Sequence, residues 1–365
     1  MPGVSHRGVI HLGLDVHRDS ISVAILGPGD EGPEVERIFH DEPSIHRLIA
    51  RFPDRKHLRA CYEAGPTGYE LHRLLASLQV RCDVVAPSLI PKAPGDRVKT
   101  DKRDCRRLAR LHRAGELVAI RIPTAWEEAV RDLCRARADL VDDRSRARRR
   151  LQSLLLRHGR VYRAGACWTG KHERWLGAQR FDDSQLQATF THYRAVVATR
   201  DAEVTAIEAD LAEAATTPPF ADAVARLAAY RGVGQLGALA VAAEVGDWRR
   251  FAHAGAFMAF TGLVPCERSS GDSVWRGHIT RTGSKHLRFQ LVESAWSYHH
   301  RPLIAGALRE RQQQVGADTL ARSWAAQLRL CRRFRQLERR KHITGVAVVA
   351  VARELAGFLW AEMQA

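Results

Sequence analysis

Disulfide and zinc motifs are missing from this sequence. Its seven cysteines are an odd number, they are scattered along the chain, and no two of them form a CxxC pair. This usage is typical of reduced thiols in a cytosol and argues against a disulfide framework or a thiolate zinc site. We therefore expect a cytoplasmic protein rather than a secreted, disulfide-rich scaffold.

Long uninterrupted apolar runs are also missing. The N-terminus lacks the apolar core of a signal peptide. The most apolar late stretch, residues 343–360, contains Arg353 and Glu354. We expect a buried packing helix there rather than a membrane span.

Acidic residues are fewer than basic residues in this sequence. The 57 Lys and Arg residues outnumber the 41 Asp and Glu residues, which gives a formal net charge of +16 and a pI near 10.2. Arginine dominates, and its planar fork of donors suits phosphate groups. A soluble protein this basic most often binds nucleic acid, and the clustering of the basic runs favours that interpretation over a merely basic surface.

The segment from Val9 to Asp15 reads as a short buried strand that ends in a carboxylate. Burying an unpaired carboxylate is costly, so a metal ion or a cationic partner is the usual way to keep one there. The alternative is that Asp15 caps a turn. If Asp15 is part of a Mg²⁺ site, other carboxylates must reach it from later in the chain.

The first 90 residues alternate strands and helices in a pattern typical of a mixed α/β sheet. A second strand that ends in a carboxylate runs from Leu58 to Glu63. Three early strands followed by alternating helix and strand indicate a ribonuclease-H-like domain. The expected strands are 8–15, 21–26, 34–40, 58–63 and 81–86, and the expected helices are 45–52 and 69–78.

A basic loop, residues 91–99, leads into a helix that begins with Asp101 and Asp104. These two side chains are three residues apart and therefore share one face of the first turn. Acidic residues at a helix N-terminus also favour the macrodipole, which by itself explains the pair. That explanation is weaker when Asp15 and Glu63 already lie at strand ends in the same domain.

Two long helices, near 126–158 and 184–215, are expected around a loop at 159–183. Leu133, Leu140, Ala147 and Leu154 recur every seven residues in the first helix. This spacing indicates an antiparallel helical arm or coiled coil, formed within one chain or between two. The basic run 144–150 either follows phosphates or forms a solvated face.

Beyond Pro219, a helix, the sequence Gly232-Val-Gly234 and a second helix resemble a helix-hairpin-helix. In that motif, glycine amides and the following helix N-terminus hold a DNA phosphate without reading sequence. A Gly-x-Gly between helices can equally be a tight turn.

Residues 262–284 read as a loop that holds Ser269 and Ser270 and leads into an amphipathic helix. A serine before a glycine is common in turns, so the residues alone do not make Ser270 catalytic. A strongly basic helix follows at 318–341, and it either faces RNA or DNA or forms a solvated surface.

Taken together, these segments resemble the bacterial insertion-sequence transposases that have a RuvC-like N-terminal domain and a distinct C-terminal transposase domain. Some members of that family are described as bridge-RNA-guided recombinases. The resemblance covers nearly the whole chain and rests on five ordered blocks. They are Gly13-Leu-Asp15-Val-His-Arg-Asp, Tyr62-Glu63-Ala-Gly-Pro-Thr-Gly, Lys99-Thr-Asp101-Lys-Arg-Asp104, the Gly232-Val-Gly234 segment, and Gly262-Leu-Val-Pro through Ser270-Gly271 to Gly283 and Arg288.

The resemblance implies a catalytic set that binds Mg²⁺ or Mn²⁺, formed by Asp15, Glu63, Asp101 and Asp104. It also implies a serine nucleophile directly before a glycine, which selects Ser270, with the adjacent Ser269 as the alternative. The implied partners are DNA, a non-coding guide RNA and further copies of the chain, in a dimer or tetramer. The expected domains are a RuvC-like domain (1–122), a coiled-coil arm (123–217) and a mostly helical transposase domain (218–365).

Several residues are expected to contact nucleic acid because of their charge, their place near the serine or, for the two glycines, their place in the helix-hairpin-helix-like segment. They are Lys99, Gly232, Gly234, Arg276, Arg281, Lys285 and Arg288. The competing interpretation is a RuvC-like, Mg²⁺-dependent, structure-selective endonuclease that needs the four carboxylates but forms no covalent intermediate.

Overall fold

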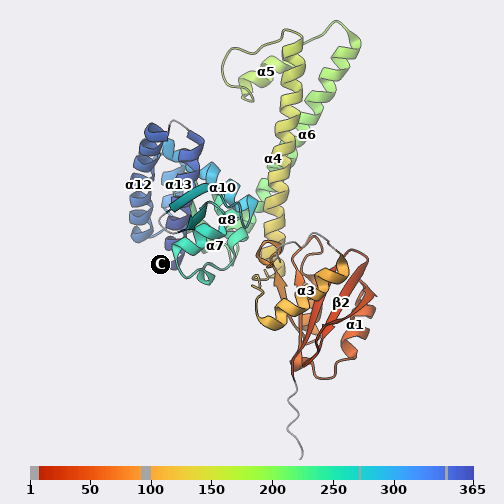
Figure 1. The fold of residues 1–365 in the computed structure, drawn as a ribbon. Helices are drawn as coiled ribbons and strands as arrows, with labels where there is room; N and C mark the ends of the chain where they lie inside the picture. Colours follow the sequence, from red (N-terminus) through yellow and green to blue (C-terminus); the bar gives the residue numbers. More distant parts are fainter. Residues whose placement is uncertain (1–7, 92–99, 271–272, 342–343) are drawn as a thin grey trace, which may run out of the picture. The chain divides into compact units, whose positions relative to one another are not determined.

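The computed structural model describes residues 8–91, 100–270, 273–341 and 344–365. The chain divides into two compact units, Met1–Ile122 and Pro123–Ala365 (Figure 1). The first unit is built around a five-stranded sheet, and the second is mostly helical. This confirms the predicted combination of a mixed α/β domain with helical parts.

The sheet of the first unit has the strand order β3-β2-β1-β4-β5. Strands β1, β2 and β3 pair in antiparallel fashion, whereas β1, β4 and β5 are parallel. Parallel neighbours require crossover connections, and helices α1 (Glu42–Ala50) and α2 (Glu70–Ser77) lie in them. The strands are β1 (Ile10–Val16), β2 (Ser20–Leu26), β3 (Glu34–Phe39), β4 (Leu58–Glu63) and β5 (Arg81–Val85).

The two faces of β1 carry different residues, because side chains alternate along a strand. Leu12 and Leu14 are buried in the main core of this unit, together with Leu71 and Leu75 of α2. His11, Gly13 and Asp15 point to the opposite face. That face is covered by α3 (Asp101–Ala114), which packs against β1 and β2.

Gly13 lets α3 lie directly on the sheet. A Cβ added at Gly13 would be 2.3 Å from the Cys105 carbonyl oxygen and 2.5 Å from the Ala109 backbone nitrogen. Both atoms belong to the helix backbone, which cannot turn aside as a flexible side chain can. The position of α3, and of the acidic residues at its start, therefore depends on the missing side chain.

Replacing Gly13 with Ala should destabilise the protein by roughly 1–3 kcal/mol, because overpacking forces the helix away from the strand. Chemical denaturation followed by circular dichroism would measure the loss. Gly177→Ala is the matched control, since Gly177 lies inside a helix with nothing within 4 Å of the added Cβ. The control should be neutral or slightly stabilising. An unchanged midpoint for Gly13→Ala would show that α3 does not need this close approach.

The second unit begins with a helical arm. Helices α4 (Ala125–Arg157) and α6 (Ser184–Thr216) run side by side in antiparallel directions (Figure 1). A Thr124 capping box begins α4, as its side chain accepts from the Glu127 amide and the Glu127 carboxylate accepts from the Thr124 amide. Both long helices match the prediction to within about two residues.

Several arginines of α4 are matched by acids on α6. The Nε of Arg137 donates to Glu208 at 2.8 Å, and Arg148 donates to Asp201 at 2.6 Å. Arg144 lies 3.8 Å from the same Asp201 carboxylate. These cross-helix pairs neutralise basic residues of α4 within an intramolecular helix pair.

The prediction of a plain loop at 159–183 was wrong, because helix α5 (Gly170–Ala178) lies within it. Thr169 caps this helix by accepting from the His172 amide, and Leu176 is buried against the arm with Leu151 and Phe190. A helix of nine residues has too few turns to show a clear apolar period. Its stability comes from packing on α4 and α6.

The rest of the second unit is a helical core. Its helices are α7 (Ala221–Ala228), α8 (Gln235–Val245), α9 (Ala254–Phe260), α10 (Lys285–Trp296), α11 (Ala307–Gln312), α12 (Ala317–Lys341) and α13 (Thr344–Gln364). Helix α13 is long and apolar enough to cross a membrane by length and composition alone, a test that core helices also pass. Its residues Val348, Val351, Leu355 and Leu359 are buried in the core of this unit.

A buried carboxylate ties α13 to its neighbours. Glu362 is fully buried and accepts hydrogen bonds from Thr319 and Arg322 of α12, from Arg226 of α7 and from Tyr230. Burial alone would raise its pKa, but these donors lower it to about 2. The charge therefore persists in the core and anchors the first half of α12.

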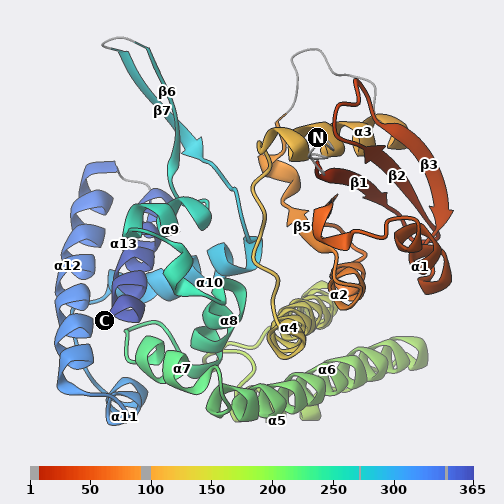
Figure 2. The same cartoon turned by 90° about the horizontal axis from the view of Figure 1, so that it is seen from below.

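Residues 262–284 do not form the predicted loop throughout. Strands β6 (Pro265–Ser270) and β7 (Ser273–Ile279) pair as an antiparallel ribbon that extends away from helices α7 to α10 (Figure 2). Nearly every described residue of β7 is exposed or half-exposed, including Val274 and Trp275. A ribbon without a buried face leaves no alternation of apolar and polar residues, so the strand signal is absent from the sequence.

Candidate functional site

The first unit brings carboxylates from three segments to one region. Asp15 lies near the end of β1, and Glu63 is the last residue of the parallel neighbour β4. Because Leu14 pairs with Tyr62, Asp15 and Glu63 are the next residues along the two strands. Asp101 and Asp104 occupy the first turn of α3, which packs on the same strands.

Asp15 and Asp101 meet around a histidine. His17 Nε2 lies 3.3 Å from Asp15 Oδ2 and 3.5 Å from Asp101 Oδ2. One ligand atom of each of the three residues lies within 4.8 Å of the others, a spacing that can hold a metal ion. Two of the four predicted carboxylates are therefore part of one compact group.

Asp104 and Glu63 lie outside this compact group. The Asp104 side chain is only 17% exposed, and its carboxylate is 3.8 Å from Arg107. Asp104 is still close enough to Asp15 to raise its pKa. Glu63 is exposed and adjacent to Asp15 by strand register alone.

The electrostatics of the site favour a cation. Burial is the largest cause that raises the pKa of Asp15, and the negative charges of Asp101 and Asp104 raise it further. The nearby His17 acts in the opposite direction. A divalent ion would relieve this repulsion, and a donor set dominated by carboxylate oxygens suits Mg²⁺ or Mn²⁺. The residues present therefore fit a hard divalent cation.

The sequence-based prediction missed His17. It lies two residues after Asp15, just beyond the end of β1. An Asp-x-His spacing at a strand end was the available signal, because residues i and i+2 of an extended chain point the same way. His17 is thus a further member of the candidate site.

A second polar cluster lies on the same sheet face. His112 Nε2 donates to Asp83 at 3.1 Å, which leaves His112 Nδ1 to accept from His11 Nδ1 at 3.3 Å. Burial is the main cause that lowers the pKa of both histidines, to about 4 for His11. Neutral rings at pH 7 satisfy one another here and bring no positive charge to the carboxylates.

The predicted serines lie in the β6–β7 ribbon. Ser269 Oγ donates to Glu267 at 2.8 Å, and Arg276 Nε donates to the same carboxylate at 3.2 Å. These contacts lower the pKa of Glu267. Ser270 ends β6, and its backbone pairs with Ser273, while its side chain lies outside the described part of the structure. Lys99 also lies outside the described residues.

The predicted basic contacts fall into two groups. Arg276 is paired with Glu267, and one Arg288 nitrogen donates to the carbonyls of Thr261 and Thr282. Arg288 therefore holds the segments that flank the ribbon. Arg281 and Lys285 are exposed, and within residues 8–91, 100–270, 273–341 and 344–365 neither has an ion pair with a carboxylate.

The two predicted phosphate-binding glycines have different surroundings. A Cβ at Gly232 would lie 2.1 Å from the Ser294 carbonyl oxygen, and its φ of +82° also favours glycine. Packing against α10 therefore explains Gly232. Gly234 is the N-cap of α8, and nothing lies within 4 Å of an added Cβ. Of the two, only Gly234 has open space beside a helix N-terminus.

Comparison with known families accounts for both units. Residues 12–159 match the DEDD transposase domain of the IS110 family, and residues 224–306 match the transposase IS116/IS110/IS902 family. The first match includes Asp15, Glu63, Asp101 and Asp104.

Full-length relatives carry the same assignment. The chain is 32% identical to the transposase for insertion sequence element IS1533 of Leptospira borgpetersenii over 339 residues, covering 90% of this chain and 96% of that protein. It is 40% identical over 356 residues to y4qE of Sinorhizobium fredii, which bears a transposase name, covering 96% and 87% of the two chains. The chain therefore belongs to the IS116/IS110/IS902 family of transposases, enzymes that cut and rejoin DNA.

Proposed function

We propose that this transposase exchanges DNA strands through a serine nucleophile, Ser270 or the adjacent Ser269, together with Mg²⁺ or Mn²⁺ held by Asp15, Glu63, Asp101 and Asp104. The observation that carries the metal part is the convergence of Asp15, His17 and Asp101 within 4.8 Å. A metal site built from these side chains suits phosphoryl transfer, because that reaction needs positive charge close to the non-bridging phosphate oxygens. Bound divalent ions would supply that charge.

The serine step forms one bond and breaks one. The serine Oγ attacks a DNA phosphorus, the bond from phosphorus to the 3′ oxygen breaks, and the hydroxyl proton ends on the released 3′ oxygen. The product is a 5′-phosphoserine linkage, which conserves the energy of the broken phosphodiester. A free 3′-hydroxyl can then reverse the reaction on a new strand, so no external energy source is needed.

Other parts of the chain would hold the DNA. Arg281 and Lys285 are exposed cations close in sequence to the serines, and the open α8 N-terminus at Gly234 suits a phosphate. Arg276, Gly232 and Lys99 are weaker candidates within the same proposal. Arg288 contributes by positioning the segments that it joins.

Guidance by a structured RNA and action as a dimer or tetramer rest on the resemblance to bridge-RNA-guided members of the family. In such an assembly the carboxylates of one copy could complete the serine site of another. The reaction would take place in the cytoplasm, where the element's DNA is accessible.

A metal-dependent endonuclease is the second candidate, because the carboxylate cluster forms within the first unit without any serine. Incubating the protein with DNA that carries the element's ends and Mg²⁺, followed by denaturing electrophoresis, separates the two. A covalent protein–DNA species supports the serine reaction. Free 5′-phosphate ends without any protein-linked strand would support hydrolysis instead.

A further inference from the structure

The second half of α12 carries an unusual density of positive charge. Residues 329–341 include seven Arg or Lys residues and a single acid, Glu338. The side of this segment that faces the core is formed by Leu330, Cys331, Phe334 and Leu337, all of them buried. The arginines are therefore distributed over the remaining surface of the helix.

One edge of this surface is neutralised within the chain. Arg329 and Arg333 both donate to Glu354 of α13, each at 3.1 Å. Glu338 lies 3.6 Å from His299 and accepts from Thr344, so it faces a different neighbour. Glu354 and Glu338 thus form their contacts on the sides of α12 that pack against the rest of the second unit.

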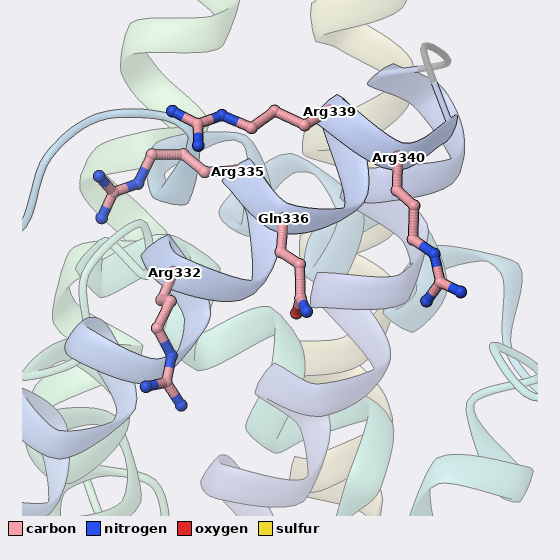
Figure 3. Close-up of a pocket in the computed structure, with 5 residues that line it drawn as sticks. All are labelled: Arg332, Arg335, Gln336, Arg339 and Arg340. Carbon is pink, nitrogen blue, oxygen red and sulfur yellow. The ribbon is translucent and has the colours of Figure 1, made fainter.

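The other edge has no such neutralisation. Arg332, Arg335, Arg339 and Arg340 are exposed and line a surface pocket together with Gln336, all from α12 (Figure 3). Figure 3 shows Arg335 and Arg339 extending toward the same side, with Gln336 between Arg332 and Arg340. Within the described residues, no carboxylate forms an ion pair with any of these four arginines.

This arrangement costs the helix stability. Arg332 and Arg335 are three residues apart and Arg335 and Arg339 are four apart, so like charges are neighbours on the helix surface and repel each other. The helix macrodipole favours cations only in the last turn, which accounts for Arg339 and Arg340 but not for Arg332 and Arg335. A bound polyanion would turn the repulsion into attraction.

The spacing fits a nucleic-acid backbone. With a rise of about 1.5 Å per residue, Arg332 and Arg339 are about 10 Å apart along the helix axis. That distance is about the axial rise of three nucleotide steps along one DNA strand. Arginine donors suit phosphate oxygens, and contacts of this kind hold DNA without reading its sequence.

We propose that the edge of α12 formed by Arg332, Arg335 and Arg339 binds the phosphate backbone of duplex DNA. Duplex DNA is favoured as the occupant because the family's reaction is performed on DNA. The inference goes beyond the proposed chemistry, since it requires neither the serine nor a metal ion. It can therefore be tested with EDTA present, where strand exchange cannot take place.

The test measures the affinity of the full-length protein for a 30-base-pair duplex of arbitrary sequence across a series of salt concentrations in EDTA. Wild-type protein is compared with the triple variant Arg332→Gln, Arg335→Gln, Arg339→Gln. Loss of about three phosphate contacts should make the plot of log K against log salt shallower by about 2–3 units. The unfolding midpoint of the variant should be unchanged or higher, because the like-charge pairs are gone.

The matched control removes three arginines that already pair with carboxylates, Arg51, Arg73 and Arg200. Its net charge changes by the same amount, so its salt slope should stay near the wild-type value. Equal salt slopes in the wild-type protein and the α12 variant would overturn the proposal. An equal decrease of the salt slope in the α12 variant and the control variant would overturn it as well. A loss seen with an RNA duplex but not with DNA would also overturn it, by assigning the surface to RNA.

Discussion

Replacing Asp15 with Asn should lower DNA strand exchange by about a thousandfold or more. The substitution eliminates a metal-binding carboxylate, and this should cost several kcal/mol of transition-state stabilisation. Each 1.36 kcal/mol of lost stabilisation lowers the rate tenfold. Asp15 is chosen because it is the least exposed member of the compact group, and because its pKa responds both to His17 and to the acids of α3. The rate of strand exchange on DNA carrying the element's ends measures the effect.

Two further measurements separate lost chemistry from lost structure. Calorimetric titration with Mn²⁺ should show weakened binding, while affinity for duplex DNA in EDTA stays near the wild-type value. The metal-free variant should unfold at or above the wild-type temperature at pH 7. The reason is that burial and neighbouring acids raise the pKa of Asp15, so the folded protein disfavours the charged carboxylate. The neutral amide of Asn does not carry this cost.

Asp19→Asn is the matched control for Asp15. The Asp19 side chain is 86% exposed, follows the same strand, and lies 3.4 Å from Arg18. Its substitution should leave both exchange and Mn²⁺ binding unchanged. Wild-type exchange by the Asp15 variant would exclude the carboxylate site from the reaction.

Replacing Ser270 with Ala should eliminate the covalent protein–DNA species and strand exchange altogether. Without the hydroxyl there is no nucleophile to form the 5′-phosphoserine bond, whereas metal binding in the first unit should be untouched. Trapping the adduct by denaturation and digesting it to a phosphopeptide would identify the attached residue directly. Affinity for DNA should remain close to that of the wild-type protein.

Ser269→Ala is the informative partner variant. The Ser269 hydroxyl already donates a hydrogen bond to the Glu267 carboxylate. Removing this hydroxyl should therefore disturb the ribbon and leave formation of the protein–DNA adduct in place. The opposite pattern, with the adduct lost only in Ser269→Ala, would move the nucleophile by one residue. Adduct formation by the double variant would refute a serine nucleophile at either position.

Local patterns determined much of the fold. The seven-residue spacing of Leu133, Leu140, Ala147 and Leu154 predicted α4, and the order of strands and helices predicted the mixed sheet. These features depend on residues close in sequence, whose periodicity records which side of an element is buried. The ribbon at 265–279 and helix α5 escaped prediction because one has no buried face and the other has too few turns.

The candidate site was only partly contained in the sequence. Asp15 and Glu63 were recognisable as carboxylates at strand ends, and Asp101 as an acid that begins a helix. That His17 joins Asp15 and Asp101, while Glu63 stays outside their group, was decided by how α3 lies on β1. Likewise, the sequence showed a basic α12, but only packing decided that Glu354 neutralises one edge and leaves the other free. Side chains distant in sequence meet through the packing of whole elements, and no local pattern of residues records that packing.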